Sequence, residues 1–166
     1  AEDRRVQPPE DWKLGVQAYT FRKFTFFETV EKCDALGVRY VEMYPGQRIG
    51  GGLEGNTHHG MDAATREAIW AKLAKHNVRV AGYGVVRGRN EADWRKIFEF
   101  ARDMVIDVVN TEPGPDELDL VARLADEYEV QVGLHNHAHP SRYWNPEAVL
   151  DACEGRTWRM GACADT

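Results

Sequence analysis

The sequence lacks several features that would define its class. No apolar run approaches the roughly 18 residues of a membrane-spanning helix. The three cysteines, Cys33, Cys153 and Cys163, form no CxxC pair, so neither a disulfide framework nor a structural zinc site is predicted. Acidic residues outnumber basic ones by 27 to 21, and the net charge is −6, whereas contact with a phosphate backbone usually needs a basic patch. We therefore expect neither a membrane nor a nucleic acid as partner.

What remains is the composition of an ordinary globular domain. Of the 166 residues, 43% are hydrophobic and 29% are charged, which is enough for one core and little for two. Residues 1–11 are polar with paired prolines and are expected to form a tail, so that residues 12–166 make up the domain. The sequence leaves the compartment open between the cytoplasm and, after removal of a signal peptide, the periplasm or exterior.

From residue 14 onward, a short apolar β-type run followed by an amphipathic helix recurs. Strand starts fall near residues 14, 38, 78, 105, 130 and 158. Residues that can accept hydrogen bonds from free backbone N–H groups stand at the expected helix starts: Thr25 with Glu28, Asp62, Asn90, Asp116, and Asn145 before Pro146. Because parallel strands need long crossovers, strands that alternate with helices predict a parallel α/β sheet.

Two architectures share this pattern, the open doubly wound sheet and the (β/α)8 barrel. Neither a GxGxxG nor a GxxxxGK(S/T) loop is present, which removes the usual phosphate signatures of the open sheet. Polar residues stand at the expected strand ends: Glu42, Glu112, His135 and Asp165. In a barrel these ends form one ring at the C-terminal face, where such enzymes place their active sites. The pattern therefore favours a barrel.

The stretch VQVGLHNHAHP, residues 130–140, is the strongest chemical signal. His135, His137 and His139 lie on one face if the strand continues that far, because strand side chains alternate with a period of two. Several imidazoles at a strand end indicate a metal site, although hydrogen-bonded polar residues or direct substrate contacts are alternatives. His139 is better explained as a loop residue. Asp165 stands 30 residues after His135, at the next strand end, and is the next candidate ligand.

At these residues the sequence resembles the xylose-isomerase-like TIM barrels, the sugar phosphate isomerase/epimerase family that also includes endonuclease IV. The resemblance covers residues 12–166, and its most specific pieces are ALGVRYVEMY, GLHNHAHP and GACADT. It implies a divalent metal at the C-terminal mouth, with His135 where many members have a glutamate ligand and Asp165 at the ligand aspartate. Further family ligands belong to strands seven and eight, so the resemblance implies about six βα units of an incomplete barrel.

The resemblance also implies a reaction class. A histidine in place of glutamate suits Mn, Zn, Fe or Co better than Mg. The expected activity is that of a sugar or sugar-phosphate isomerase or epimerase, which removes a proton next to a carbonyl. A keto-sugar or inosose lyase or dehydratase, which starts with the same step, is an alternative. A non-catalytic sugar-binding or assembly module is an alternative of another class.

Roles follow for individual residues. Glu112 and His137 are the expected acid/base groups, unless Glu112 pairs with Arg87 or Arg89. Contacts with the sugar or polyol are expected from Glu42, Tyr83, Arg87 and Trp144. The adjacent His58 and His59 lie in a glycine-rich loop, residues 45–60, that is expected to overhang the mouth, where solvated histidines are an equally simple explanation. The 166-residue chain is expected to be inactive alone. A homo-oligomer is a further expectation.

Overall fold

Six parallel strands form the centre of the molecule in a computed structural model that describes residues 12–165. The expected tail, residues 1–11, lies outside the described residues. The strands are β1 Gly15–Gln17, β2 Tyr40–Met43, β5 Arg79–Tyr83, β6 Val108–Thr111, β7 Gln131–His135 and β8 Met160–Cys163. Their order in the sheet is β1-β2-β5-β6-β7-β8, and each strand pairs in parallel with its neighbour in this order. The predicted barrel-type order is confirmed.

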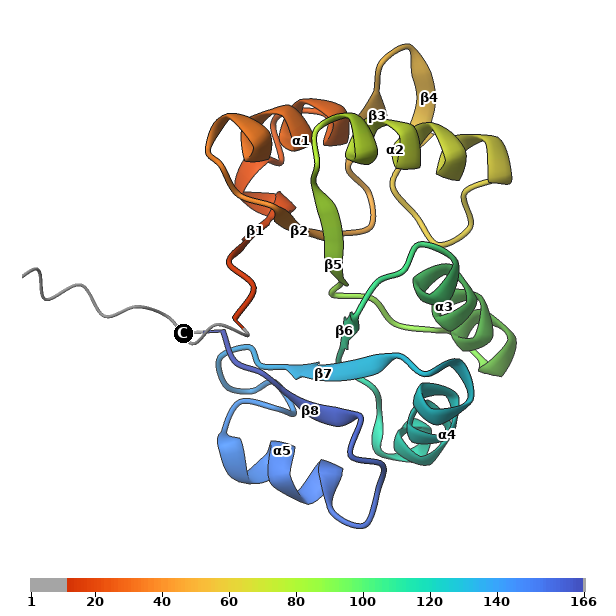
Figure 1. Ribbon diagram of the computed structural model, residues 1–166. Helices are drawn as coiled ribbons and strands as arrows, with labels where there is room; N and C mark the ends of the chain where they lie inside the picture. Colours follow the sequence, from red (N-terminus) through yellow and green to blue (C-terminus); the bar gives the residue numbers. More distant parts are fainter. Residues whose placement is uncertain (1–11, 166) are drawn as a thin grey trace, which may run out of the picture.

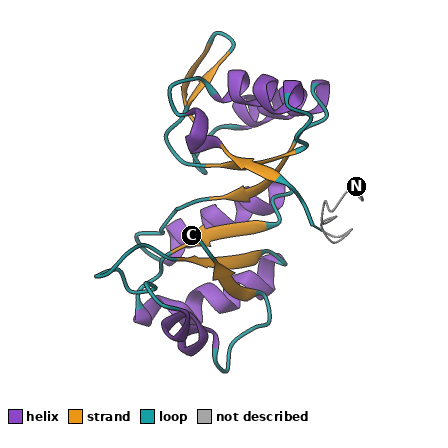
Figure 2. Cartoon of the chain, turned by 90° about the vertical axis from the view of Figure 1, so that its left-hand side faces the viewer, coloured by secondary structure: helices purple, strands orange, loops and turns teal. Residues whose placement is uncertain are grey.

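Five α-helices connect these strands: α1 Phe26–Ala35, α2 Ala63–Lys75, α3 Glu91–Asp103, α4 Leu118–Tyr128 and α5 Pro146–Cys153. They run around the outer side of the curved sheet, and no helix within residues 12–165 covers its other side (Figure 1). Figure 2 shows the six strands following one another down the molecule. Within the described residues β1 and β8 each pair with one strand only, so the barrel is not closed. None of these helices is long and apolar enough to span a membrane.

Capping side chains start four of the five helices where the sequence predicts. Thr25 Oγ1 accepts from the Glu28 N–H at 3.2 Å, and Glu28 Oε2 accepts from the Thr25 N–H at 2.7 Å, which completes the capping box. Asp62, Asn90 and Asn145 each accept from the N–H three residues on, at 2.8 to 3.0 Å.

The predicted cap at Asp116 is wrong. Pro115 begins a 3-10 turn, Pro115–Glu117, that runs directly into α4, so Asp116 already lies inside the helical winding. Proline is preorganised for the first helical position, which moves the start of the winding ahead of Asp116. The free N–H of Gly114 donates instead to Glu117 Oε2 at 2.7 Å.

The core lies between the sheet and the helices. Val41, Val109 and Leu134 of the sheet are fully buried in one core with apolar residues of the helices, such as Trp94, Ile97, Phe98 and Ala101 of α3. The side chains that alternate with these along each strand point to the other face of the sheet. On that face Glu42 accepts a hydrogen bond from Asn110 Nδ2 at 2.9 Å. A Cβ on Gly133 would lie 2.2 Å from Asn110 Oδ1, so this polar pair requires glycine on the neighbouring strand. The inner face of the sheet therefore carries a polar pair at its centre.

The glycine-rich loop contains an antiparallel hairpin that the strand pattern did not predict, β3 Arg48–Gly50 and β4 Leu53–Asn56. Gly50, Gly51 and Gly52 all have positive φ, which only glycine adopts readily, and this allows the tight reversal. The hairpin packs on α1, since a Cβ on Gly50 would come within 2.6 Å of Thr25 Oγ1. It lies beside α1 (Figure 1) and does not overhang the strand ends.

Candidate metal centre

A cleft of about 760 Å³ lies at the C-terminal ends of the strands. Residues that follow β1, β2 and β5 line it together with residues at the ends of β7 and β8: among them Gln17, Tyr19, Arg22, Tyr44, Val85, His135, His137 and Asp165. Because parallel strands end at one edge of a sheet, residues far apart in the sequence meet here. The cleft is the mouth that the sequence predicts.

Glu112, His135 and His137 form one cluster in which a ligand atom of each lies within 4.8 Å of the others. Glu112 follows β6, and His135 ends the neighbouring strand β7. Glu112 Oε1 contacts His137 Nδ1, and the two imidazole rings meet edge to face with centroids 4.6 Å apart. Two imidazoles and one carboxylate make a donor set that can hold a divalent metal.

Glu112 pairs with this cluster and with neither of the arginines considered from the sequence. Its second oxygen, Oε2, accepts from Ser141 Oγ at 3.2 Å. Arg87 pairs with Glu117 instead, and Arg89 pairs with Asp93. Both carboxylate oxygens of Glu112 are therefore engaged by partners at the mouth.

His135 is held from two sides. Cys163 stands opposite it in the β7–β8 ladder, with Sγ 3.6 Å from His135 Nδ1. Burial, together with the charges of Glu42 and Asp165, raises the pKa of the Cys163 thiol to about 11, so the thiol stays protonated at neutral pH. Asp165 Oδ2 lies 3.9 Å from the other ring nitrogen, Nε2. The two predicted ligands, His135 and Asp165, are thus brought together.

Two positioning residues escaped the sequence analysis, Asn136 and Cys163. Asn136 exchanges hydrogen bonds with the backbone of Asp165, donating from Nδ2 to the carbonyl at 2.8 Å and accepting at Oδ1 from the N–H at 2.7 Å. The only signal in the sequence was the asparagine between two histidines. Cys163 had no signal beyond its place in the last strand.

Glu42 lies on the inner face of the sheet and lines a second hollow of about 460 Å³ with Gln17, Asn110 and Cys163. Burial raises the pKa of Glu42, and the hydrogen bond from Asn110 opposes that rise. The structure therefore places Glu42 beside the cleft on the barrel interior. Its contact with a sugar stays a prediction.

Three other residues expected to bind the sugar lie elsewhere. The prediction for Tyr83 is corrected, because its side chain is fully buried and packs against Phe100 with ring centroids 5.0 Å apart. The register pairs Tyr83 with Met43, so both face the helices. Arg87 is held by Glu117 outside the cleft. Trp144 is half-exposed beside His139 and lines an apolar groove between α5 and β8.

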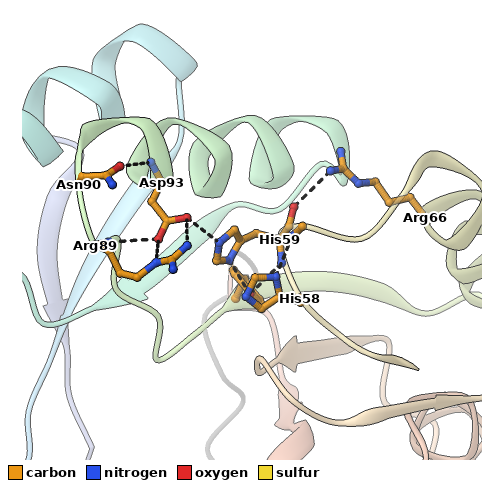
Figure 3. Close-up of polar contacts among 8 residues, drawn as sticks. His58, His59, Arg66, Arg89, Asn90 and Asp93 are labelled. Atoms are coloured by element: carbon orange, nitrogen blue, oxygen red, sulfur yellow. Dashed lines mark hydrogen bonds and ion pairs between the residues drawn. The ribbon is translucent and has the colours of Figure 1, made fainter. Parts of the chain in front are cut away.

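His58 and His59 are not among the residues that line the cleft. Figure 3 shows His59 between His58 and Asp93. His59 is buried, with Nδ1 3.3 Å from the Tyr83 hydroxyl and Nε2 3.6 Å from Asp93 Oδ1. Asp93 in turn accepts from Arg89 Nε at 2.9 Å. Burial, with a smaller contribution from His58, lowers the pKa of His59. Both ring nitrogens of the buried His59 therefore have partners on the outer side of β5.

Comparisons with known proteins define the fold. No protein-family model matches the sequence, and no curated protein sequence matches it. The crystal structure of an uncharacterised protein from Parabacteroides distasonis superposes with a TM-score of 0.84 at 30% identity, over 93% of this chain and 63% of that one. A xylose isomerase domain protein from Planctomyces limnophilus superposes with a TM-score of 0.62 at 13% identity, over 91% and 61% of the two chains.

A sugar phosphate isomerase/epimerase from Parabacteroides distasonis gives a TM-score of 0.53 at 11% identity, over 84% of this chain and 63% of that one. The chain thus spans 61 to 63% of the length of these three structures. The similarity shows a fold of the xylose-isomerase-like barrel class, of which this chain forms six strands.

Proposed function

We propose that this chain carries the metal-binding part of a sugar isomerase or epimerase that removes a proton next to a carbonyl group. The observation that carries the proposal is the cluster of Glu112, His135 and His137 at the C-terminal mouth of a barrel-type sheet. Structures with the same fold include proteins named as a xylose isomerase domain protein and a sugar phosphate isomerase/epimerase, which supports the choice of reaction class.

The donor set fits a divalent metal. His135 Nδ1 contacts the Cys163 thiol, which leaves Nε2 for a metal, and Asp165 Oδ2 lies 3.9 Å from that nitrogen. Metal-binding histidines commonly have their second ring nitrogen engaged by a neighbouring group, most often a carboxylate, a backbone carbonyl or water. We assign His135 and Asp165 as ligands. Mixed nitrogen and oxygen ligation favours Mn, Zn, Fe or Co over Mg.

We assign Glu112 and His137 to the movement of the proton. Both oxygens of Glu112 are engaged, one by His137 Nδ1 and one by Ser141. A carboxylate on Nδ1 fixes the orientation of the ring, as in other carboxylate–histidine pairs. Nε2 of His137 is left to accept the proton, and this side chain is 59% exposed at the cleft. A divalent metal bound here would act as a Lewis acid toward the carbonyl oxygen of the substrate.

The first experiment measures metal binding. Apo protein extended to close the barrel, which adds the further ligands expected on strands seven and eight, is titrated with Co²⁺, and the visible absorption of the bound ion is followed together with calorimetry. We expect one ion per chain in the parent, and a loss of affinity of about tenfold or more in His135→Ala and Asp165→Ala, because each removes a ligand. His139→Ala is the matched control. Parent protein that binds no ion, or variants that bind as tightly as the parent, would contradict the ligand assignment.

The second experiment measures proton removal. D-fructose and D-xylulose are incubated in D2O with metal-loaded protein extended to close the barrel, and loss of the hydrogen next to the carbonyl is followed by NMR. We expect His137→Asn and Glu112→Gln to slow exchange about 10²- to 10⁴-fold while metal content stays unchanged. Loss of metal in these variants would instead make Glu112 and His137 ligands, as their proximity to His135 also permits. Unchanged exchange would assign the base to another residue.

A further inference from the structure

The cleft contains a single strongly basic side chain. Among the described residues that line it, Arg22 is the only lysine or arginine. It follows the 3-10 helix Ala18–Phe21, so the turn after β1 brings it to the same cleft as His135 and Asp165. A permanent positive charge therefore shares this space with the candidate metal ligands.

Within residues 12–165 the guanidinium of Arg22 has no acidic partner. Most arginines within residues 12–165 have a carboxylate oxygen within 4.0 Å, as Arg39, Arg66 and Arg156 do. Arg22, Arg48 and Arg142 have no such partner in that part of the chain, and only Arg22 of these three lines the cleft. In a chain with a net charge of −6, an arginine without an acidic partner at a cleft is an unusual feature.

Two tyrosines orient this arginine. Its guanidinium carbon lies 4.9 Å from the centroid of the Tyr19 ring, and Nη1 donates to the Tyr19 carbonyl at 3.4 Å. Tyr44 meets Tyr19 edge to face, with centroids 5.2 Å apart. Stacking on an aromatic ring reduces the freedom that arginine loses when it binds a ligand. Most of its N–H donors remain available.

The geometry points to a sugar that bears a carboxylate, such as a keto-sugar acid, as the substrate class of this cleft, with Arg22 binding the carboxylate. This inference rests on the proposed function of the cleft. The parallel N–H donors of a guanidinium match the two oxygens of a carboxylate. A phosphate group carries nearly twice the charge, and proteins commonly bind it with several backbone N–H groups. A single arginine, in a cleft that the exposed Asp165 also lines, balances the single charge of a carboxylate better than the charge of a phosphate.

The test compares three ligands of similar size on the whole 166-residue chain. Binding of D-glucuronate, D-glucose and D-glucose 6-phosphate is followed by NMR at constant ionic strength, first without metal and then with Co²⁺. We expect D-glucuronate to bind about fivefold more tightly than D-glucose, as for a partly exposed ion pair of about 1 kcal/mol. The preference should disappear in Arg22→Gln and persist in part in Arg22→Lys. Arg48→Gln, which makes the same charge change on the β3–β4 hairpin, should keep it.

Each outcome decides the inference. Equal binding of glucuronate and glucose, tighter binding of the phosphate, or an unchanged preference in Arg22→Gln would overturn it. An equal loss of preference in Arg48→Gln would also overturn it, because the effect would then be one of overall charge. The proposed metal function is read separately from the Co²⁺ titration, since the carboxylate preference is measured without metal as well.

Discussion

Asn136 and Asp165 are joined by two reciprocal hydrogen bonds, at 2.8 and 2.7 Å. The side-chain amide of Asn136 takes the place of a peptide group and continues the pairing of β7 and β8 beyond the ends of both strands. This clamp sets the backbone from which the Asp165 carboxylate reaches within 3.9 Å of His135 Nε2. We infer that Asn136 is a positioning residue for Asp165, which we propose as a metal ligand.

The clamp predicts an effect on metal affinity. Asn136→Asp keeps the shape of the side chain but loses the donor to the Asp165 carbonyl, so Asp165 should no longer be held beside His135. We expect Co²⁺ affinity to fall about tenfold, as for other residues that orient metal ligands. Asn56→Asp, on the exposed strand β4, is the control for the added charge. Equal Co²⁺ affinities in Asn136→Asp and the parent would show that Asp165 needs no clamp.

A second prediction concerns the stability of the protein at mildly acidic pH. Burial lowers the pKa of His59 in the folded protein below its value near 6.5 in the unfolded chain. The neutral form therefore stabilises the fold, fully above pH 6.5, and this contribution is lost as the pH falls through the lower folded pKa. The urea concentration at the midpoint of unfolding should decrease less steeply in His59→Gln than in the parent as the pH is lowered from 8 to 5. The exposed His139→Gln should retain the parent slope.

A third prediction concerns the Tyr83 hydroxyl, which is fully buried and accepts from the His59 N–H at 3.2 Å. Tyr83→Phe removes this acceptor and the partner of His59 Nδ1 without changing the packing of the ring. We expect the free energy of unfolding to decrease by about 1 to 3 kcal/mol, the cost of leaving buried polar groups unpaired. Tyr19→Phe, on a half-exposed ring, should change it far less. If chemical denaturation showed the same decrease in the free energy of unfolding for Tyr83→Phe and Tyr19→Phe, the His59 network would not stabilise the core.

A fourth prediction concerns association between copies of the chain. The free edge of β8 borders an apolar groove of about 520 Å³ that Leu134, Val149, Leu150 and Met160 line. Unpaired strand edges beside apolar surface promote association. We expect the 166-residue chain to self-associate as its concentration rises, as measured by light scattering. Leu150→Lys should raise the concentration at which association begins. Leu53→Lys, on the β3–β4 hairpin, is the control. A parent chain that stays monomeric throughout would contradict this prediction.

The local structure of this protein could be read from its sequence. Thr25, Asp62, Asn90 and Asn145 cap helices as predicted, because a capping side chain needs only the N–H groups of the next few residues. The order of the strands followed as well, because short βα units leave little choice but to place each strand beside the previous one. The pairing of His135 with Asp165 followed from the same order, since both end neighbouring strands.

Only the tertiary structure decided which side chains share the mouth. A register shift between Val41 and Glu42 sets the alignment of β2 with β5 and places Tyr83 opposite Met43, in the core. A strand shifted by one residue exchanges its two faces, and nothing local in the sequence of β5 specifies that shift. Arg22 and Asn136 likewise acquire their places only through the fold: Arg22 lines the same cleft as His135 and Asp165, and Asn136 bonds to a backbone 29 residues away. The sequence determined the elements and their order, while the packing of sheet against helices determined which polar groups were left to face one another.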